Sequence, residues 1–143
     1  MEKESVSRFF HDLKESKTIC LLGHASPDGD CIGSAFALYE YLIRQENEKE
    51  ITIALDGKIP YNYDSYIDKS LITSVPDSKI YDMIITFDCA NENRFGCFAG
   101  ILSRGRKTVC IDHHDTNTNF ADINFVDEKA SSTGELLYRM LKL

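Results

Sequence analysis

The sequence predicts an α/β fold with a doubly wound, mainly parallel sheet flanked by helices. Short and nearly continuous apolar runs, typical of strands buried on both faces, recur along the chain. They alternate with longer segments whose apolar residues follow helical spacing, and this alternation favours a parallel sheet. The chain has 143 residues, of which 43% are hydrophobic. This size and composition predict one domain, residues 1–143, with a substantial core.

Each predicted element has its own pattern. In chain order, the predicted strands are 18–24, 51–55, 81–90 and 107–114, with a short edge strand at 121–127. Four helices are predicted. The first is N-terminal and contains Val6, Phe9, Phe10 and Leu13, and the second starts at Ile32 and has one apolar stripe of Ala35, Phe36, Tyr39, Leu42 and Ile43. The third lies around 93–103, and the last begins at the capping-box sequence Ser132-Thr133-Gly134-Glu135. Prolines and tyrosines in 56–78 predict a loop with a short helix.

Charge and composition exclude several classes of protein. The net charge is −7, which argues against binding of long nucleic acid through a basic surface but allows a small phosphate ligand beside bound cations. No apolar run approaches the roughly 18 residues of a membrane span, and the N-terminus does not resemble a signal peptide. The five cysteines form no C-x-x-C pair, so we expect a reduced, cytoplasmic protein in which Cys20, Cys89 and Cys110 are small buried hydrophobes.

Metal-capable residues follow three of the predicted strands. They are His24 after the first strand, Asp88 after the third, and Asp112, His113 and His114 after the fourth. In a parallel sheet the carboxyl ends of the strands meet at one edge, where ligands bind. Asp28 and Asp30 follow His24 closely, and the repulsion between them usually needs a cation to offset it. We therefore expect the acidic turn to form one wall of a shared site.

Each of these stretches also has a simpler interpretation. The sequence Pro27-Asp28-Gly29-Asp30 is a turn signal, Asp88 is a common type of helix cap, and 112–115 suits a solvated loop. Their joint placement at strand ends favours a metal site, because buried carboxylates without partners cost several kcal/mol each. Carboxylates and imidazoles without thiolates suit Mn²⁺ or Mg²⁺, with Co²⁺ as a further alternative, better than structural zinc, and two cations about 3.5–4 Å apart would clamp a phosphoryl group.

Four segments in a fixed order carry a resemblance to a known family. They are His24-x-x-x-Asp28-x-Asp30 with Ile32-Gly33-Ser34, Asp88 in FDCAN, Asp112-His113-His114, and Ala130-Ser131-Ser132-Thr133-x-Glu135. Together they cover nearly the whole chain, which resembles the DHH phosphoesterases. Within that family, the Pro-Asp-Gly-Asp turn and the run from Asp112 to Ala121 look most like the bacterial nanoRNase/pAp phosphatases.

The resemblance implies a role for each site residue. His24 and Asp28 would bind one manganese ion and Asp30 and His113 the second, while Asp88 would bridge the two. His114 would face the scissile phosphate, and Asp112 would orient a histidine.

Other residues are candidates for substrate contacts or for shaping the site. We expect Gly29 to let the backbone approach the metals and Gly33 to let its helix pack on the sheet. Gly33 and Ser34, near the expected helix start, would offer backbone N–H groups to a phosphate. For Arg94 and Arg104 a phosphate contact is one interpretation, and a solvated helix charge is the alternative.

The resemblance also implies an activity. It is manganese-dependent hydrolysis of short RNA oligonucleotides, of 3′-phosphoadenosine 5′-phosphate (pAp), or of both. The alternatives are hydrolysis of cyclic or linear dinucleotides, an exopolyphosphatase-like activity, and a metal- and nucleotide-binding module without turnover.

The family pattern includes parts that this sequence lacks. The family uses a further aspartate downstream and a C-terminal substrate-binding domain, and Asp122 and Asp127 come too early to supply that ligand. We therefore expect residues 1–143 to be the catalytic domain of a longer protein, weak or inactive in isolation.

Overall fold

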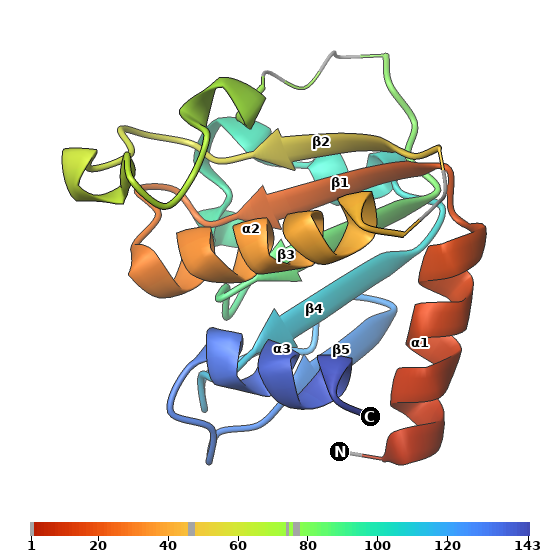
Figure 1. Cartoon of the computed structure of the whole chain (residues 1–143). Coiled ribbons are helices and arrows are strands. Elements are labelled where there is room, and N and C mark those ends of the chain that lie inside the picture. The colour runs from red at the N-terminus through yellow and green to blue at the C-terminus, as the bar shows by residue number, and fades with distance from the viewer. Residues whose placement is uncertain (1, 46–47, 74, 76–77) are drawn as a thin grey trace.

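The protein is built on a five-stranded sheet in the order β2-β1-β3-β4-β5 (Figure 1). A computed structural model describes residues 2–45, 48–73, 75 and 78–143. The strands are β1 (Thr18–Gly23), β2 (Glu50–Ala54), β3 (Met83–Phe87), β4 (Thr108–Asp112) and β5 (Ile123–Val126). All four pairings are parallel. The predicted α/β class with a parallel sheet is confirmed.

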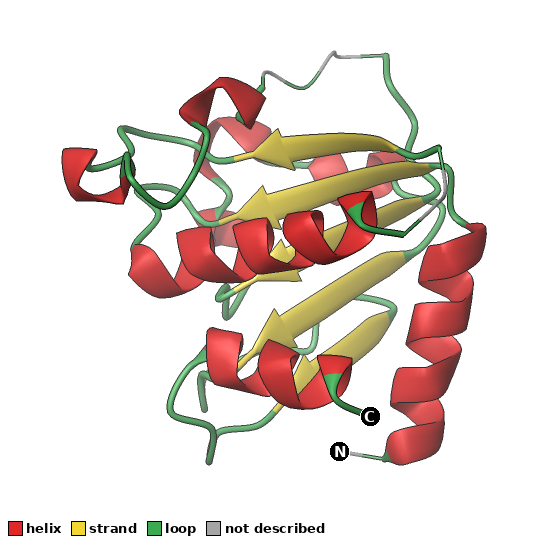
Figure 2. Ribbon diagram, in the orientation of Figure 1, coloured by secondary structure: helices red, strands yellow, loops and turns green. Residues whose placement is uncertain are grey.

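Three α-helices pack with one face of the sheet. They are α1 (Lys3–Glu15), α2 (Gly29–Ile43) and α3 (Thr133–Leu141); Figure 2 shows α2 and α3 in front of the sheet, with α1 beside it. Their apolar sides share one buried cluster with alternate strand residues such as Ile85. The ring of Phe9 in α1 lies 5.5 Å from that of Phe125 in β5, which ties the N-terminal helix to the edge strand.

The opposite face is covered by short 3₁₀ turns. The segment after β3 forms η3 (Glu92–Arg94), η4 (Gly96–Phe98) and η5 (Ile101–Arg104), so the predicted α-helix around 93–103 is wrong. Gly96 and Gly100 adopt left-handed backbone angles, with φ of 58° and 79°, and each interrupts the helical path. Phe95 and Ile101 are nevertheless buried against Cys20 and Leu22 of β1.

The remaining predicted elements differ in length. The expected strands 81–90 and 107–114 shorten to the five-residue β3 and β4. The loop expected at 56–78 contains two single-turn 3₁₀ helices, η1 (Tyr61–Tyr63) and η2 (Lys69–Leu71), and its residues 74, 76 and 77 lie outside the described residues. Helix α3 begins as predicted, because Ser132 accepts a hydrogen bond from the backbone N–H of Glu135.

The buried cysteines behave as predicted. Cys20, Cys89 and Cys110 are fully buried free thiols. Burial raises the pKa of Cys20 and of Cys89 to about 12 and that of Cys110 to about 11. They are therefore neutral and pack as small apolar groups.

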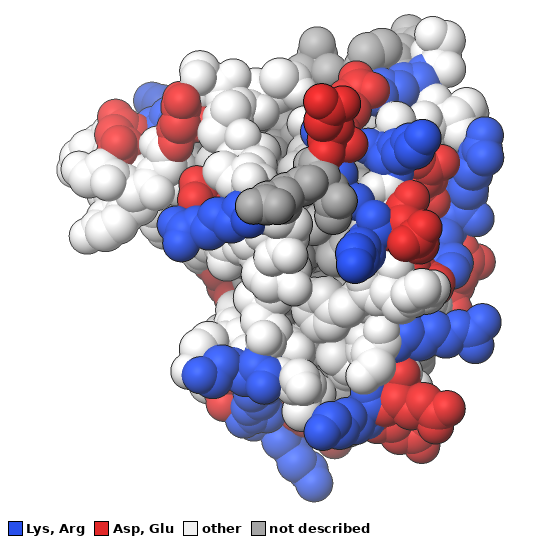
Figure 3. Space-filling model, turned by 45° about the vertical axis from the view of Figure 1, so that its right-hand side comes forward, with Lys and Arg blue, Asp and Glu red and all other residues white. Residues whose placement is uncertain are grey.

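Charges of both signs are mixed on the surface. On the face drawn in Figure 3, lysine and arginine side chains alternate with aspartate and glutamate. Among the described helices, none combines the length and the apolar character needed to cross a membrane.

Candidate metal centre

The metal-capable residues gather at the carboxyl edge of the sheet, where β1 and β3 are neighbours. The chain turns in opposite directions from these two strands, towards β2 on one side and β4 on the other, and such switch points form ligand-binding crevices. His24 follows β1 directly, and Asp88 follows β3. His113 and His114 follow β4, so the predicted strand-end placement is confirmed.

Asp88 lies at the centre of this group. Its carboxylate is buried, with only 4% of the residue exposed. One oxygen, Oδ2, lies 3.8 Å from Nε2 of His24. The other, Oδ1, lies 3.5 Å from Nε2 of His113. Its backbone has a φ of 56°, a strained region for a residue with a side chain, and that turn directs the carboxylate between the two imidazoles.

Two of the histidines are held in the same way. Nδ1 of His24 lies 2.9 Å from the carbonyl oxygen of Ala25, and Nδ1 of His113 lies 3.3 Å from that of Ala130. A carbonyl can only accept a hydrogen bond, so the proton of each neutral ring lies on Nδ1. The lone pair on Nε2 therefore faces the carboxylates, as in metal-ligating histidines.

The spacing of the donor atoms fits a cation on each side of Asp88. Nε2 of His24 lies 3.9 Å from Oδ1 of Asp28, and Nε2 of His113 lies 3.6 Å from Oδ2 of Asp30. Two ligands that are each about 2.1 Å from one ion lie roughly 3–4 Å apart. We name His24, Asp28 and Asp88 the first donor set and His113, Asp30 and Asp88 the second; the ligand atoms of the first set lie within 4.8 Å of one another, as do those of Asp88, His113 and His114.

Asp28 and Asp30 are each bound to the start of a helix. Asp28 caps α2, and its Oδ1 accepts the backbone N–H groups of Asp30 and Cys31 at 3.0 and 3.1 Å. Asp30 accepts the backbone N–H groups of Thr133 and Gly134, both at 2.8 Å, at the start of α3. The partial positive charge of two helix N-termini thus offsets part of the repulsion between these carboxylates. Sequence analysis missed the contact between Asp30 and α3.

His114 also donates from Nδ1, but to a side-chain carboxylate rather than to a backbone carbonyl. Its Nδ1 donates to Oδ1 of the buried Asp112 at 2.7 Å, and Oδ2 of Asp112 accepts from the side-chain amide of Asn117 at 2.6 Å. The hydrogen bond to Asp112 raises the pKa of His114. Nδ1 of His114 also lies 3.7 Å from Oδ1 of Asp88, but its proton is donated to Asp112. With 38% of its side chain exposed, His114 is the most accessible of the three imidazoles.

The charges at Asp88 and His24 stabilise each other. Burial raises the pKa of Asp88, but the favourable interaction with the nearby His24 ring, the hydrogen bond from Thr133 and the charges of the His113 and His114 imidazoles hold it below its ordinary value. The Asp88 carboxylate raises the pKa of His24, and burial opposes that effect. Asp88 is therefore an anion near neutral pH, as a bridging ligand must be.

The expected roles of the glycines and of Ser34 need correction. Because Asp28 caps the helix, α2 begins at Gly29 rather than near Ile32, and the backbone N–H groups of Gly33 and Ser34 lie inside it, bonded to earlier carbonyls. Gly33 is exposed, and a Cβ there would meet nothing within 4 Å, so close packing on the sheet does not require it.

Two further contacts show what these positions do. A Cβ on Gly29 would lie 2.5 Å from the Tyr63 hydroxyl, so the close approach at this glycine is to Tyr63. Ser34 is buried and directs its hydroxyl towards Asp30 at 3.5 Å. It therefore contacts a candidate ligand rather than offering its backbone to a phosphate.

The two arginines lie at opposite edges of the sheet. The carbonyl oxygen of Arg94 accepts from the backbone N–H of Ala25 at 2.7 Å, and the positive charge of Arg94 offsets a small part of the rise in the pKa values of His24 and His114. The carbonyl of Arg104 instead accepts from Tyr81, ahead of the amino end of β3. The interpretation of Arg104 as a phosphate contact at this site is therefore wrong.

The late aspartates do not join the candidate ligands. Asp122 lies at the amino end of β5, where its Oδ2 accepts from the backbone N–H and hydroxyl of Thr108. Asp127 follows β5 and pairs with Arg139 at 3.2 Å. Each carboxylate thus has a structural partner elsewhere.

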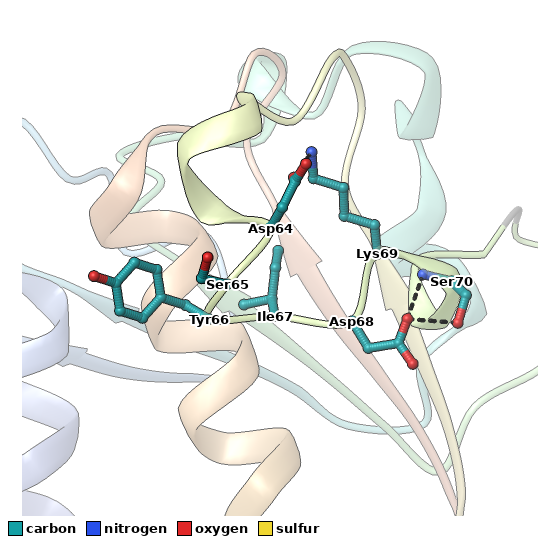
Figure 4. A pocket seen from close by; sticks show the side chains of 7 residues that line it. All are labelled: Asp64, Ser65, Tyr66, Ile67, Asp68, Lys69 and Ser70. Carbon is teal, nitrogen blue, oxygen red and sulfur yellow. Dashed lines mark hydrogen bonds and ion pairs between the residues drawn. The ribbon is translucent and has the colours of Figure 1, made fainter.

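A surface hollow away from these residues lies in the loop between β2 and β3. Seven consecutive residues, 64–70, line it (Figure 4), and Lys69 reaches back towards Asp64 across it. In the part of the chain that the structure describes, both groups of His and Asp that could hold a metal lie at the carboxyl edge instead.

Comparison with known proteins agrees with this geometry. Residues 18–143 match the model of the DHH family, N-terminal domain. The chain belongs to the DHH family. This family is metal-dependent, and this DHH chain contains groups of His and Asp that could hold a metal ion.

Several relatives of the DHH chain are known. It is 31% identical over 127 residues to a probable bifunctional oligoribonuclease and PAP phosphatase NrnA of Streptococcus mutans, covering 87% of this chain and 38% of that one. It is 30% identical to the bifunctional oligoribonuclease and PAP phosphatase NrnA of Bacillus subtilis, covering 86% and 37%. An uncharacterized protein of Mycoplasma genitalium is 27% identical, covering 100% and 44%. The DHH chain thus spans less than half the length of each of these relatives.

A solved structure shares the fold. An exopolyphosphatase-related protein from Bacteroides fragilis superimposes with a TM-score of 0.88 at 23% identity, over 99% of this chain and 44% of that one. At this identity the likeness shows the DHH fold and carries no argument about the substrate.

Proposed function

We propose that this DHH domain is a manganese-dependent phosphoesterase that hydrolyses short RNA oligonucleotides, pAp, or both. One observation carries the proposal: Nε2 of His24 and Nε2 of His113 face opposite oxygens of the same buried carboxylate, Asp88. That arrangement suits two cations sharing one bridging ligand. The printed names of two relatives, oligoribonuclease and PAP phosphatase, support this choice of substrates.

The ligand assignment follows from the two donor sets. His24 and Asp28 would hold the first ion, Asp30 and His113 the second, and Asp88 would bridge them. The chemistry that such a pair supplies is activation of a water molecule and neutralisation of charge on the phosphoryl group. Mg²⁺ and Co²⁺ suit the same oxygen and imidazole donors and are the alternatives to test.

His114 would act on the leaving group. With Nδ1 bonded to Asp112, its Nε2 is free to carry and donate a proton, and its raised pKa favours the protonated ring. Asp112 fixes the orientation of the ring and stabilises its positive charge. An open hollow beside His114 leaves room for a leaving nucleotide, and it is lined by His114, Asp115, Asn117, Asn119, Val126, Asp127, Glu128 and Lys129.

Arg94 would contact the substrate phosphate. The net charge of the chain is −7, so a polyanionic substrate needs local positive charge at the site. Arg94 is exposed, and its charge acts on His24 and His114 alike. A guanidinium in this position suits bidentate contact with a phosphate.

The test is an assay with Mn²⁺ on three substrates: a diribonucleotide, pAp and pyrophosphate. We expect slow but measurable hydrolysis of the first two by this chain, consistent with a weak isolated domain, and a loss of at least two orders of magnitude in Asp88→Asn. Glu40→Gln, an exposed carboxylate on α2, is the matched control and should match the wild type. Cleavage of pyrophosphate alone, or tight nucleotide binding without product, would overturn the proposal in favour of a polyphosphatase or a binding module.

A further inference from the structure

We propose that Thr133 is a positioning residue of the metal centre. It orients the carboxylates of Asp88 and Asp30, the two acidic residues of the second donor set. The inference rests on the proposed function for the identity of the ion. It adds α3 to a site otherwise formed by the ends of β1, β3 and β4 and the start of α2.

Thr133 contacts both carboxylates with different groups. Its hydroxyl donates to Oδ1 of Asp88 at 3.1 Å, and its backbone N–H donates to Oδ2 of Asp30 at 2.8 Å. The residue is completely buried, so both donor groups of Thr133 are shielded from water. No other residue described in the structure donates hydrogen bonds to both of these side chains.

The hydroxyl controls which way the Asp88 carboxylate faces. The terminal torsion of an aspartate is broad, so the side chain alone does not determine where each oxygen lies. The oxygen that accepts from Thr133 is the one 3.5 Å from His113, which leaves Oδ2 directed at His24. One hydrogen bond thus assigns one oxygen to each side of the site.

The start of α3 is free to bind Asp30 because another residue caps the helix. Ser132 accepts from the backbone N–H of Glu135 at 2.9 Å, so the backbone N–H groups of Thr133 and Gly134 remain available for Asp30. Adjacent residues at the start of α3 therefore have different roles. Ser132 stabilises the helix, and Thr133 orients the ligands.

The separation gives a sharp test with matched variants. Thr133→Val removes the hydroxyl while keeping the shape, Thr133→Ser restores it, and Ser132→Ala weakens the helix without touching either carboxylate. Mn²⁺ binding is measured by calorimetric titration, and the stability of each metal-free variant by denaturant unfolding. We expect Thr133→Val to weaken the second ion about tenfold or more and the first ion less, because the first shares Asp88 but not Asp30. Thr133→Ser should recover most of the affinity.

The control decides between positioning and general destabilisation. Ser132→Ala should lose stability and bind both ions as the wild type does. If Thr133→Val binds both ions normally, or if Ser132→Ala weakens the second ion to the same extent, the proposal is overturned.

A crystal structure of metal-free Thr133→Val tests the role of Thr133 independently of the proposed function. The proposal requires Oδ1 of Asp88 to move away from its place beside His113. An unmoved carboxylate overturns it, whether or not ions bind. Wild-type protein that binds no Mn²⁺, or binds it without hydrolysing any substrate, would contradict the proposed function, and the displacement of Asp88 would still decide the role of Thr133.

Discussion

Three histidines at the carboxyl edge all donate from Nδ1, but their Nε2 atoms face different surroundings. His24 and His113 donate from Nδ1 to backbone carbonyls and turn Nε2 towards Asp88. His114 donates from Nδ1 to Asp112 and leaves Nε2 free. Because the two adjacent imidazoles differ in what accepts from Nδ1 and in what Nε2 faces, His113 and His114 should respond differently to the same substitution.

His113→Ala should lose the second metal ion, whereas His114→Ala should keep both ions and lose turnover. The first variant removes a nitrogen that faces two carboxylates, and the second removes the group placed to donate a proton. We expect His114→Ala to lower kcat by about 10²–10⁴. Metal content by elemental analysis and steady-state kinetics on pAp provide the measurement. A metal-deficient His114→Ala beside a fully loaded His113→Ala would reverse the assignment of the two rings.

At the scale of elements, the same reciprocal hydrogen-bond pattern occurs twice at the amino edge of the sheet. Thr18 at the start of β1 and Asp82 before β3 bond reciprocally: the backbone N–H of Thr18 donates to the Asp82 carboxylate, and the backbone N–H of Asp82 donates to the Thr18 hydroxyl. Thr108 and Asp122 do the same for β4 and β5. These pairs join strand starts at the edge opposite the metal centre.

Asp82→Asn should remove a pH-dependent part of the stability. Hydrogen bonds from the backbone N–H groups of Thr18 and Lys17 lower the pKa of Asp82. A carboxyl whose folded pKa is lowered contributes stability above its ordinary pKa, and that contribution disappears as the pH falls through the folded value. The wild type should therefore exceed the variant in unfolding free energy by about 1 kcal/mol at pH 7.

Urea unfolding at pH 7 and at pH 3 or below measures this difference. The gap between wild type and Asp82→Asn should close at the acidic end. Glu128→Gln, which removes an exposed carboxylate on the loop after β5, should show no such gap. A difference that stays constant across the pH range would mean that the bonds do not depend on the charge of Asp82.

At the scale of the whole molecule, the site joins segments from most of the chain. The contact of Asp30 with Thr133 spans 103 residues, and the two donor sets draw on the ends of three strands. An ion held by groups so far apart binds the folded chain and not the unfolded one, so binding must stabilise the fold.

Mn²⁺ should therefore raise the melting temperature. At a hundredfold excess over Kd, one bound ion adds about 2.7 kcal/mol, which is roughly 5–10 °C for a chain of this size. Asp88→Asn, which alters the ligand shared by both sites, should show little or no shift. Thermal unfolding with Mn²⁺, Mg²⁺ and Co²⁺ in parallel ranks the three metals. An equal shift in wild type and Asp88→Asn would place the bound ion elsewhere.

The sequence by itself determined the sheet and the position of the site along the chain. Apolar runs are a local signal, and in a parallel sheet the residues that follow them must come to one edge. His24, Asp88 and His113 could therefore be assigned to a shared site before any contact was known. The capping box at Ser132 was equally visible, because a cap depends on residues only three apart.

Only the tertiary structure decided what those residues contact. Asp30 binds the start of α3, although nothing in the turn that contains Asp30 indicates a partner 103 residues away. The segment after β3 has helical spacing, but left-handed angles at Gly96 and Gly100 break it into 3₁₀ turns. Periodicity reports which side of a segment is apolar, whereas hydrogen bonds between distant segments depend on how the elements pack, and that packing placed Thr133 against Asp88.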